Sequence, residues 1–305
     1  MPVFINEQNL ESIILSLFES TYRYISKSTP SIFLIGSALK NRTSGSREKI
    51  RRLIEKRSPY HRGYEVYYPE DLFDELMKSN KGFNLLDLEN MLARSVHGIV
   101  IILSSPGSIA ELGSFSNNEN LLSKLIVIVD KKYKNKNSFI MLGPVKLIKD
   151  RDKDRVIFYD SINTDFPELI NKIKKELSKN IKTRFDIDET VNNPIALQIF
   201  ILFVIYVFEK ISRDSLRKAL KTIVGVKVGV ESSFEDDKLV GTIIKILIKK
   251  NHIQLNGDKY VITSIGKEEM KKTIGRSFSR FQITKTLDEC RIRILNLERK
   301  GVKLN

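Results

Sequence analysis

The chain has 305 residues, about twice the length of a common domain, so two folded domains are expected. Hydrophobic residues make up 41% of it and charged residues 29%, a composition that excludes global disorder. Its 52 Lys and Arg residues against 37 Asp and Glu give a net charge of +15, and residues 211–305 hold 21 of the basic but only 11 of the acidic ones. Such a surface indicates a polyanionic partner, because each neutralised phosphate releases counterions. The alternative is a basic face that serves only solubility.

The first 160 residues alternate between short apolar segments and helix-like segments, which predicts a parallel sheet covered on both faces. The expected strands are residues 31–36, 64–68, 98–103, 125–129 and 156–159. Helices are expected at residues 47–56, 85–96 and 108–122. The fold class is therefore α/β, with a Rossmann-like domain over residues 1–165.

Residues 166–192, with a charged helix from Pro167 to Asn180, are expected to link this domain to a second one. The second domain, residues 193–305, starts with a very apolar helix over 195–210. Further helices are expected at Ser212–Leu220, with Ser212 as its cap, and at Phe234–Lys250. Two short runs at 252–255 and 259–263 flank Asn256-Gly257-Asp258, a strong hairpin signal. This order predicts a winged helix-turn-helix followed by a C-terminal helix.

The single cysteine, Cys290, excludes an internal disulfide framework and a cysteine-based zinc site, and it fits a reducing compartment. The N-terminal segment has no basic region, so a signal peptide is not expected. The apolar run from Ile195 to Phe208 has 14 residues, fewer than a membrane-spanning helix needs. We therefore expect a soluble cytoplasmic protein without a membrane partner.

In an open parallel sheet, ligands bind beyond the carboxyl ends of the strands. Gly36-Ser37 and Pro69-Glu70-Asp71 follow the first two expected strands, and the segment from Ser104 to Gly113 follows the third. This last segment is expected to deliver Glu111 on the first turn of a helix, directly above the sheet edge. The alternative for Glu111 is a capping box with Ser108, in which the carboxylate only closes the start of the helix.

A family resemblance rests on several motifs: Asp87-Leu-Glu on a helix, Ser105-Pro-Gly-Ser108 before Ala110-Glu111-Leu-Gly113, and Ser138-Phe139 before Gly143-Pro144. Together they resemble the nucleoside 2-deoxyribosyltransferase family, and more closely the deoxyribosyltransferase-like effectors of bacterial retrons. The resemblance covers residues 31–150. It implies that Glu111 is the catalytic carboxylate and that Asp87 binds substrate. The transferases usually carry an aspartate six residues before the catalytic glutamate, where this chain has Ser105. Hydrolysis, or transfer to another acceptor, is therefore expected rather than base exchange between nucleosides.

The chemistry also follows from the residue types. Cleavage of an N-glycosidic bond passes through a cationic, oxocarbenium-like sugar, which a carboxylate such as Glu111 can stabilise or bind covalently. The resemblance and the missing aspartate together favour NAD as substrate, because its nicotinamide leaves without a general acid. The expected substrate-binding residues are Gly36, Ser37, Asp87, Ser105, Gly107 and Ser108. Arg42 and Arg47 could assist, although a solvated helix face is the expected role of Arg47.

Other catalytic templates fit poorly. The sequence contains neither a Walker A motif nor a GxGxxG after the first strand, so a resident dinucleotide cofactor is not expected and NAD or a related nucleotide would be substrate only. The histidines His61, His97 and His252 lack the spacing of metal ligands, so no metal site is expected, and His97 is expected to begin a buried strand.

The second domain carries the candidate nucleic-acid-binding residues, which are Arg213, Arg217, Lys238, Lys245, Lys249, Lys259, Arg276 and Arg280. Phe278 and Phe281 lie among them, where they could stack on bases or pack in the core. Winged helices also dock on proteins, so a purely protein-binding role is the alternative. The retron resemblance implies a reverse transcriptase and its branched RNA–DNA product, msDNA, as partners, and it leaves room for a higher-order assembly.

The sequence thus favours an antiviral toxin effector of a retron, in which an N-glycosidase domain using Glu111 is held in check by msDNA and reverse transcriptase bound through the second domain. The alternative is a non-catalytic DNA-binding regulator whose α/β domain senses a nucleotide. Product formation that is lost on changing Glu111 distinguishes the enzyme, whereas ligand binding and release without turnover distinguishes the regulator.

Overall fold

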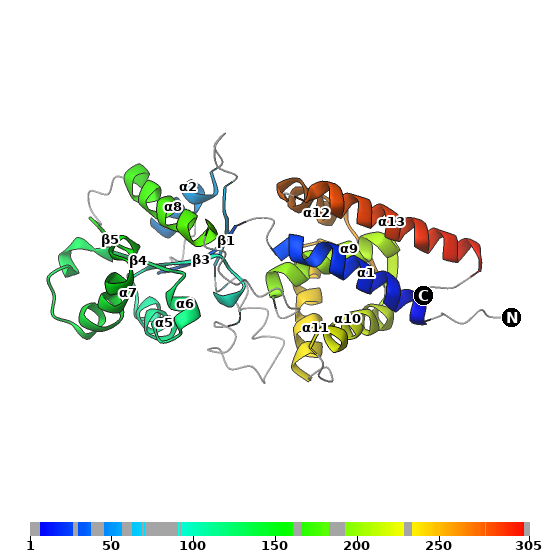
Figure 1. Ribbon diagram of the computed structural model, residues 1–305, viewed down its shortest axis with the longest axis horizontal. Coiled ribbons are helices and arrows are strands. Elements are labelled where there is room, and N and C mark those ends of the chain that lie inside the picture. The colour runs from blue at the N-terminus through cyan, green and yellow to red at the C-terminus, as the bar shows by residue number, and fades with distance from the viewer. Residues whose placement is uncertain are drawn as a thin grey trace. The chain divides into compact units, whose positions relative to one another are not determined.

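The computed structural model describes residues 7–26, 30–37, 46–56, 63–68, 70, 91, 93–160, 166–182, 193–228, 234–277 and 279–301. These residues form two compact units (Figure 1). One unit lies within residues 30–182 and contains the parallel sheet. The other combines residues 7–26 with residues 193–301 and is mainly helical.

The first unit is built on a parallel sheet of five strands in the order β2-β1-β3-β4-β5. The strands are β1 (Ser31–Ile35), β2 (Glu65–Tyr67), β3 (Gly98–Ile102), β4 (Leu125–Asp130) and β5 (Val156–Tyr159). Every residue of β1, β3 and β4 is buried, as expected for central strands covered on both faces. The sheet confirms the five strands and the α/β class that the apolar runs predicted.

Helices cover both faces of this sheet (Figure 1). On one face lie α2 (Ser46–Glu55) and α8 (Phe166–Lys182), which also contact each other. On the other face lie α5 (Pro106–Ser116), α6 (Glu119–Leu122) and α7 (Lys146–Arg151), the last preceded by a π-helical segment, Met141–Val145. The amphipathic α2 and α8 pack Ile54 and Ile173 into the core beside strand residues such as Val100. Of the helix expected over residues 85–96, only 91 and 93–96 are described.

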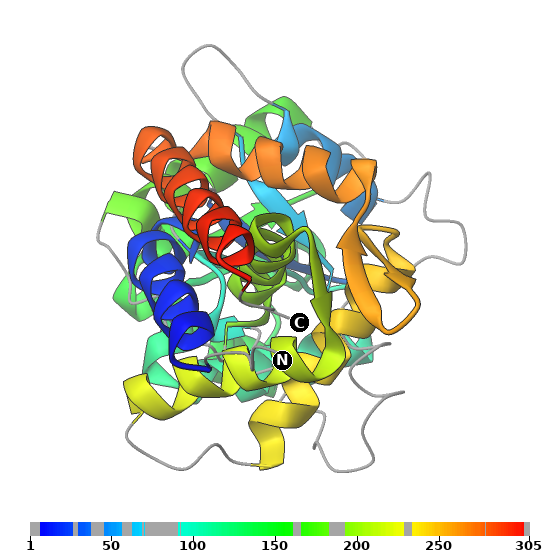
Figure 2. The ribbon, with the colours of Figure 1, turned by 90° about the vertical axis from the view of Figure 1, so that its right-hand side faces the viewer.

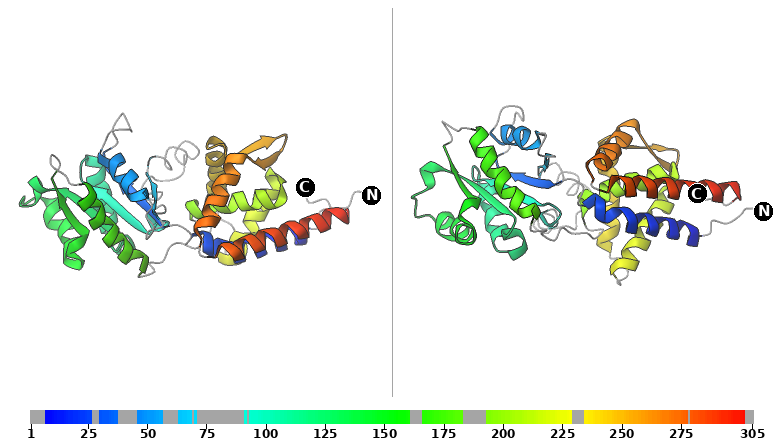
Figure 3. Two further views of the ribbon diagram at one scale, coloured as in Figure 1. Left: turned by 90° about the horizontal axis from the view of Figure 1, so that it is seen from above. Right: turned by 45° about the horizontal axis from the view of Figure 1, so that its top comes forward.

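The second unit follows the order helix, strand, helix, helix, two strands, helix, helix. Its elements are α9 (Pro194–Phe208), β6 (Lys210–Ser212), α10 (Arg213–Val228), α11 (Phe234–Lys249), β7 (Ile253–Asn256), β8 (Lys259–Ile262), α12 (Ser264–Arg276) and α13 (Arg280–Arg299). The strands form an antiparallel sheet in the order β6-β8-β7, and the β7–β8 hairpin projects from the helices (Figure 3). The hairpin confirms the Asn-Gly turn signal. The strand β6 was not expected, because the apolar helix was expected to run through residue 210.

The core of this unit is α9, which is apolar on every side. Phe200 and Phe203 are fully buried, and α9 packs against α11, α12 and α13. Its polar residue Gln198 is also buried, but its Nε2 donates to the carbonyl of Pro194 (3.1 Å) and its Oε1 accepts from Lys250 Nζ (3.1 Å). A helix that is apolar all round is stable only inside a protein or a membrane. Among the described residues, no helix meets the length and hydropathy that a membrane span requires.

The N-terminal helix α1 (Glu7–Ser26) also belongs to the helical unit. It packs beside α13, as the neighbouring blue and red helices in Figure 2 show, and it also contacts α9 and α10. The rings of Phe18 and Tyr22 stack with centroids 4.5 Å apart, and both meet Phe200 edge-on at 5.4 and 5.6 Å. The expectation that residues 1–165 form the α/β domain is therefore wrong for this helix, because its apolar face is buried against α9.

Close backbone packing at Gly266 gives a test of the helical unit. A Cβ atom at Gly266 would lie 2.1 Å from the carbonyl oxygen of His252, whereas one at Gly275 of the same helix would meet nothing within 4 Å. We expect Gly266→Ala to lower the free energy of unfolding by about 1–3 kcal/mol or more through overpacking. Gly275→Ala is expected to leave it unchanged or raise it by about 0.4–1 kcal/mol. Urea unfolding followed by circular dichroism compares the two, and equal effects would contradict the packing assignment.

Candidate active site and nucleic-acid interface

The site of the α/β unit lies where the strand order reverses. The connection after β1 leads to β2 on one side of this point, and the connection after β3 leads to β4 on the other side. The two connections therefore run in opposite directions from neighbouring strands. At this point Gly36 packs against the end of β3, where its added Cβ would lie only 3.1 Å from the Cβ of Ile102. Glycine therefore allows the two strand ends to approach this closely. The contact draws the loops after β1 and β3 together.

A serine cluster ties these two loops to each other. The amide of Ser37 donates to Ser104 Oγ (3.0 Å), which joins the end of β1 to the end of β3. The hydroxyl of the buried Ser108 accepts the amides of Ser104 (3.2 Å) and Ser105 (3.1 Å). In return, the amide of Ser108 donates to Ser105 Oγ (3.2 Å). The structure thus brings together Gly36, Ser37, Ser105 and Ser108, which were predicted from separate segments.

These bonds correct the predicted start of the helix. The N-cap of α5 is Ser105, with Pro106 at the first helical position, and the capping box joins Ser105 to Ser108 rather than Ser108 to Glu111. The helix expected at residues 108–122 therefore begins two residues earlier, and it ends at Ser116 before the short α6. Proline at the first helical position was the signal for this start. Glu111 consequently lies on the second turn of α5 and not on the first.

Glu111 occupies a partly buried position between exposed Ala110 and buried Leu112. It is three residues after Ser108, so both lie on the same side of α5, one turn apart. The nearby Gly107 and Gly113 are exposed, and a Cβ would come no closer than 3.9 Å to another atom at the first and meet nothing within 4 Å at the second. Gly107, four residues before Glu111, therefore leaves the surface of α5 open one turn before the carboxylate, whereas Gly113 lies on another side of the helix.

Arg47 differs from its expected role on a solvated helix face. Its side chain is 11% exposed, and its Nη1 donates to the carbonyl of Gly36 at 3.0 Å. The same guanidinium forms an ion pair with Glu70, which follows β2, and lies 4.3 Å from the ring centre of Tyr68. Arg47 therefore fastens the loop after β1 to the end of β2. This long-range contact could not be found from the sequence, where Arg47 is one of several charged residues on α2.

Tyr68 and Glu48 complete the polar edge of this site. The hydroxyl of Tyr68 donates to Glu48 Oε2 at 2.6 Å. Burial, together with this bond to a carboxylate, raises the pKa of Tyr68 to about 12. The same hydrogen bond lowers the pKa of Glu48, so at neutral pH the pair is a neutral phenol donating to a carboxylate.

The remaining candidate residues of this unit are Asp87, Arg42 and His97. Asp87 and Arg42 lie outside the described residues. His97 precedes β3, and its Nδ1 lies 3.1 Å from both the amide and the hydroxyl of Ser31, so it joins the starts of two strands. Within the described part of the chain, no group of three or more His, Cys, Asp or Glu side chains could hold a metal ion.

In the helical unit, three of the predicted nucleic-acid-binding residues lie close together. Lys259 of β8 is paired with Ser212 of β6, and Arg213 follows directly at the start of α10. The guanidinium of Arg213 lies 6.0 Å from the ring centre of Tyr260, and both Arg213 and Arg217 are near enough to act on the Tyr260 pKa, which burial raises. Ser212 caps α10 as predicted, because its hydroxyl accepts the amide of Ser215 at 3.1 Å.

The other predicted basic residues are more dispersed. Lys245 and Lys249 lie exposed on α11, whereas Arg276 ends α12 and Arg280 begins α13. The side chain of Lys238 and all of Phe278 lie outside the described residues. Phe281, beside Arg280, is exposed and not packed in the core.

Comparison with known proteins places the chain in a family. A profile of the family described as "STM3845 retron effector protein" matches residues 44–255, which is more than half of the chain. The chain belongs to this retron effector family. The match begins before α2 and ends in β7, so it spans most of the α/β unit and the start of the helical unit.

Two curated relatives of this retron effector come from Escherichia coli. It is 31% identical over 283 residues to the "Retron Ec86 putative ribosyltransferase/DNA-binding protein", and the alignment covers 88% of this chain and 85% of the relative. It is 32% identical over 143 residues to the protein of the same description from retron Ec73, covering 46% of this chain and 45% of that relative.

The serine cap of α5 gives the test of the site in this retron effector. Ser108→Ala removes the acceptor of two amides and one half of the capping box, so we expect it to lower the free energy of unfolding by about 1 kcal/mol. Ser114→Ala on the same helix is the matched control, with an expected change within about 0.5 kcal/mol. Thermal and urea unfolding measure both variants. If the two lost the same stability, the cap would not hold the loop.

Proposed function

We propose that this retron effector is an antiviral toxin that cleaves the N-glycosidic bond of NAD or a related nucleotide, with Glu111 as the catalytic carboxylate. The observation that carries the proposal is the Ser37–Ser104 hydrogen bond, which joins the residues just after β1 and β3 at the reversal of strand order, with Glu111 on the helix that starts there. The relatives from retrons Ec86 and Ec73, whose names give ribosyltransferase and DNA-binding roles, support it further.

The reaction breaks the bond between C1′ of the ribose and the ring nitrogen of nicotinamide, and the electron pair leaves with the nitrogen. Because the ring nitrogen of NAD is already cationic, nicotinamide departs neutral and needs no general acid. The carboxylate of Glu111 stabilises the resulting oxocarbenium ion or bonds to C1′, and water then adds to C1′. The products are nicotinamide, ADP-ribose and a proton.

The remaining predicted residues would hold the substrate. Phosphates bind readily at the start of a helix, where backbone amides point outward. In this chain, the serine cap uses the amides of Ser105 and Ser108, so the amide of Gly107 is the one that would meet a phosphate. Gly36 and Ser37 lie beside this start of α5, tied to it by the Ser37–Ser104 hydrogen bond. We assign the pyrophosphate to this edge. Asp87 stays a predicted substrate-binding residue.

The helical unit is proposed to be a winged helix-turn-helix that docks on the nucleic acid and reverse transcriptase of the retron. Its order from α9 to β8, with a three-stranded antiparallel sheet and a projecting hairpin, is typical of that fold (Figure 3). Arg213, Arg217 and Lys259 supply positive charge beside the hairpin, as contact with phosphates requires. Binding of msDNA and reverse transcriptase would keep the glycosidase inactive until infection.

The catalytic proposal is tested with NAD. The purified chain, alone and assembled with reverse transcriptase and msDNA, is incubated with NAD and with a panel of nucleotides, and release of free base is followed by chromatography. Wild type is expected to release nicotinamide, and Glu111→Gln is expected to reduce the rate at least about a hundredfold, because the charge that stabilises the sugar cation is lost.

The matched control is Asp150→Asn, which neutralises an exposed carboxylate on α7 of the same unit and is expected to keep the wild-type rate. Absence of base release in every assembly state, with Glu111→Gln still folded, would overturn the glycosidase. Saturable nucleotide binding in that case would support the non-catalytic regulator instead.

The docking proposal is tested by the salt dependence of duplex binding. Arg213→Ala/Arg217→Ala is expected to weaken binding to a labelled DNA duplex and to lower the slope of log K against log salt by about 1–2, as one or two phosphate contacts are lost. Lys285→Ala/Arg299→Ala on α13 removes the same charge away from the hairpin and is expected to change neither quantity much. Weak wild-type binding that does not depend on salt would assign this surface to protein partners alone.

A further inference from the structure

The connection that follows β4 carries an unusual surface that the proposed functions do not use. Residues 131–139 are nine consecutive exposed residues, and they include four lysines, two aromatic residues and no carboxylate. Phe139 is 83% exposed and Tyr133 is 43% exposed. A single exposed apolar residue is ordinary, but here two exposed aromatic residues share one short connection with four lysines, and such a combined surface fits a binding partner.

This connection reaches the free edge of the sheet. The strand β5 is an outer strand of the order β2-β1-β3-β4-β5, and the ammonium of Lys134 lies 5.5 Å from the ring centre of Phe158 in β5. Phe158 lines a hollow of about 240 Å³ together with Lys153, Lys172 and Lys175. The lysine-rich connection and the hollow are therefore neighbours, and both combine lysines with an aromatic ring.

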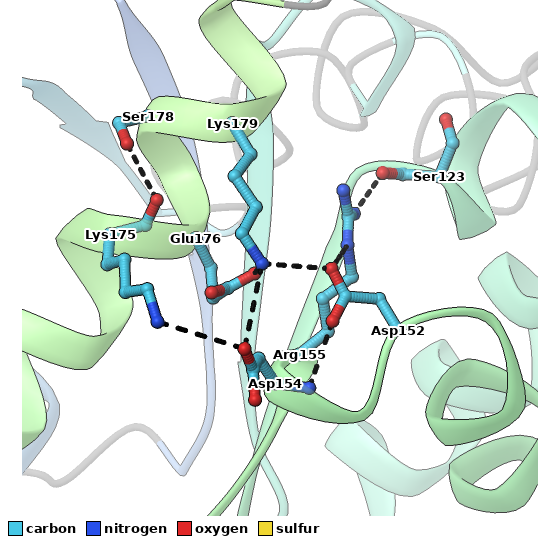
Figure 4. A network of polar contacts seen from close by, with 8 residues as sticks. All are labelled: Ser123, Asp152, Asp154, Arg155, Lys175, Glu176, Ser178 and Lys179. Atoms are coloured by element: carbon cyan, nitrogen blue, oxygen red, sulfur yellow. Dashed lines mark hydrogen bonds and ion pairs between the residues drawn. The ribbon is translucent and has the colours of Figure 1, made fainter.

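One of the residues that line this hollow is a buried carboxylate. Glu176 lines it, and its side chain is only 2% exposed. Its Oε2 forms an ion pair with Lys179 Nζ at 2.8 Å, but within the described part of the chain its Oε1 has no hydrogen-bond partner (Figure 4). A buried carboxylate oxygen without a donor is costly, and a ligand N–H group would satisfy it.

The charges around the hollow leave cations available. Lys172 is paired with Glu168 at 2.6 Å, and Lys175 with Asp154 at 3.8 Å (Figure 4). For Lys134, Lys136 and Lys153, no carboxylate among the described residues lies within ion-pair distance. These three lysines flank the two exposed aromatic residues and the hollow, so the surface attracts an anion that also has planar rings.

We propose that the connection 131–139 and the hollow beside β5 form a binding surface for single-stranded nucleic acid. Phosphates would contact Lys134, Lys136 and Lys153, and bases would stack on Tyr133 and Phe139. One base would enter the hollow against Phe158 and donate an N–H to Glu176. Unpaired strands are the fitting ligand because their base faces are accessible, whereas a lysine-rich surface is unlike a protein interface, where lysine is depleted. This surface lies within the α/β unit, and its argument does not depend on Glu111 chemistry.

The test uses the full chain carrying Arg213→Ala/Arg217→Ala, so that binding through the helical unit is reduced. Affinity for a fluorescein-labelled single strand of mixed sequence is measured by anisotropy at several salt concentrations. Lys134→Ala/Lys136→Ala is expected to weaken binding about tenfold or more and to lower the salt slope by about 1.4, since each phosphate contact on a single strand contributes about 0.7. Lys146→Ala/Lys149→Ala, which removes two exposed lysines from α7 of the same unit, is the matched control.

Stacking and base recognition are tested separately. Phe139→Ala is expected to weaken single-strand binding fivefold or more without changing the salt slope, because the ring contacts bases and not phosphates. Leu147→Ala, another exposed apolar residue, is expected to leave binding unchanged. Unchanged affinity in Lys134→Ala/Lys136→Ala, or an equal loss of affinity in Lys146→Ala/Lys149→Ala, would overturn the proposal. A protein partner would then be the alternative occupant of this surface. NAD cleavage by the same variants is expected at the wild-type rate, so failure here and failure of the glycosidase are distinguishable.

Discussion

The close contact of Gly36 with Ile102 is the constraint on which the candidate site depends. Two connections leave the centre of the sheet in opposite directions from neighbouring strands, and a side chain at position 36 would crowd Ile102 at the end of β3. Glycine removes that obstacle, so Ser37 can bond to Ser104 and the start of α5 can lie beside the end of β1. Arg47 then holds the same glycine in place by donating a hydrogen bond to its carbonyl oxygen. The close packing of the strand ends, the serine cap and the start of the helix that carries Glu111 therefore lie together at this one glycine.

The helical unit depends on a different condition, the absence of any polar face on α9. Twelve of its 15 residues are buried, so this helix needs neighbours on all sides. Those neighbours, α1, α11, α12 and α13, pack against α9, and described charged residues such as Glu19, Lys245 and Lys285 lie exposed on them. The basic surface of the unit is therefore a consequence of how its core is covered, and the hairpin adds Lys259 beside the first turn of α10.

Much of this architecture could be predicted from the sequence, because continuous apolar runs are sufficient to indicate buried parallel strands. Because ligands bind at the carboxyl ends of such strands, the sequence also predicts that Gly36, Ser37 and Ser108 lie close together, as the hydrogen bonds through Ser104 show. Local signals also mark two further helices: Pro106 stands at the start of α5, and the apolar spacing from Leu10 to Ile25 is that of the amphipathic α1. Long-range contacts had no such signal. The role of Arg47 and the strand β6 depend on residues far away in the chain.

The position of α1 has a consequence for the order in which the protein is made. The helix is synthesised before the parallel sheet, yet its partners α9 and α13 are synthesised only after the whole sheet. Until then the apolar faces of Phe18 and Tyr22 have no native site, while the α/β unit already holds all of its own strands and can fold. The packing of α1 is thus completed only when α9 and α13 have been made. A chain whose synthesis stops before them leaves a folded α/β unit that is preceded by a helix with an exposed apolar face.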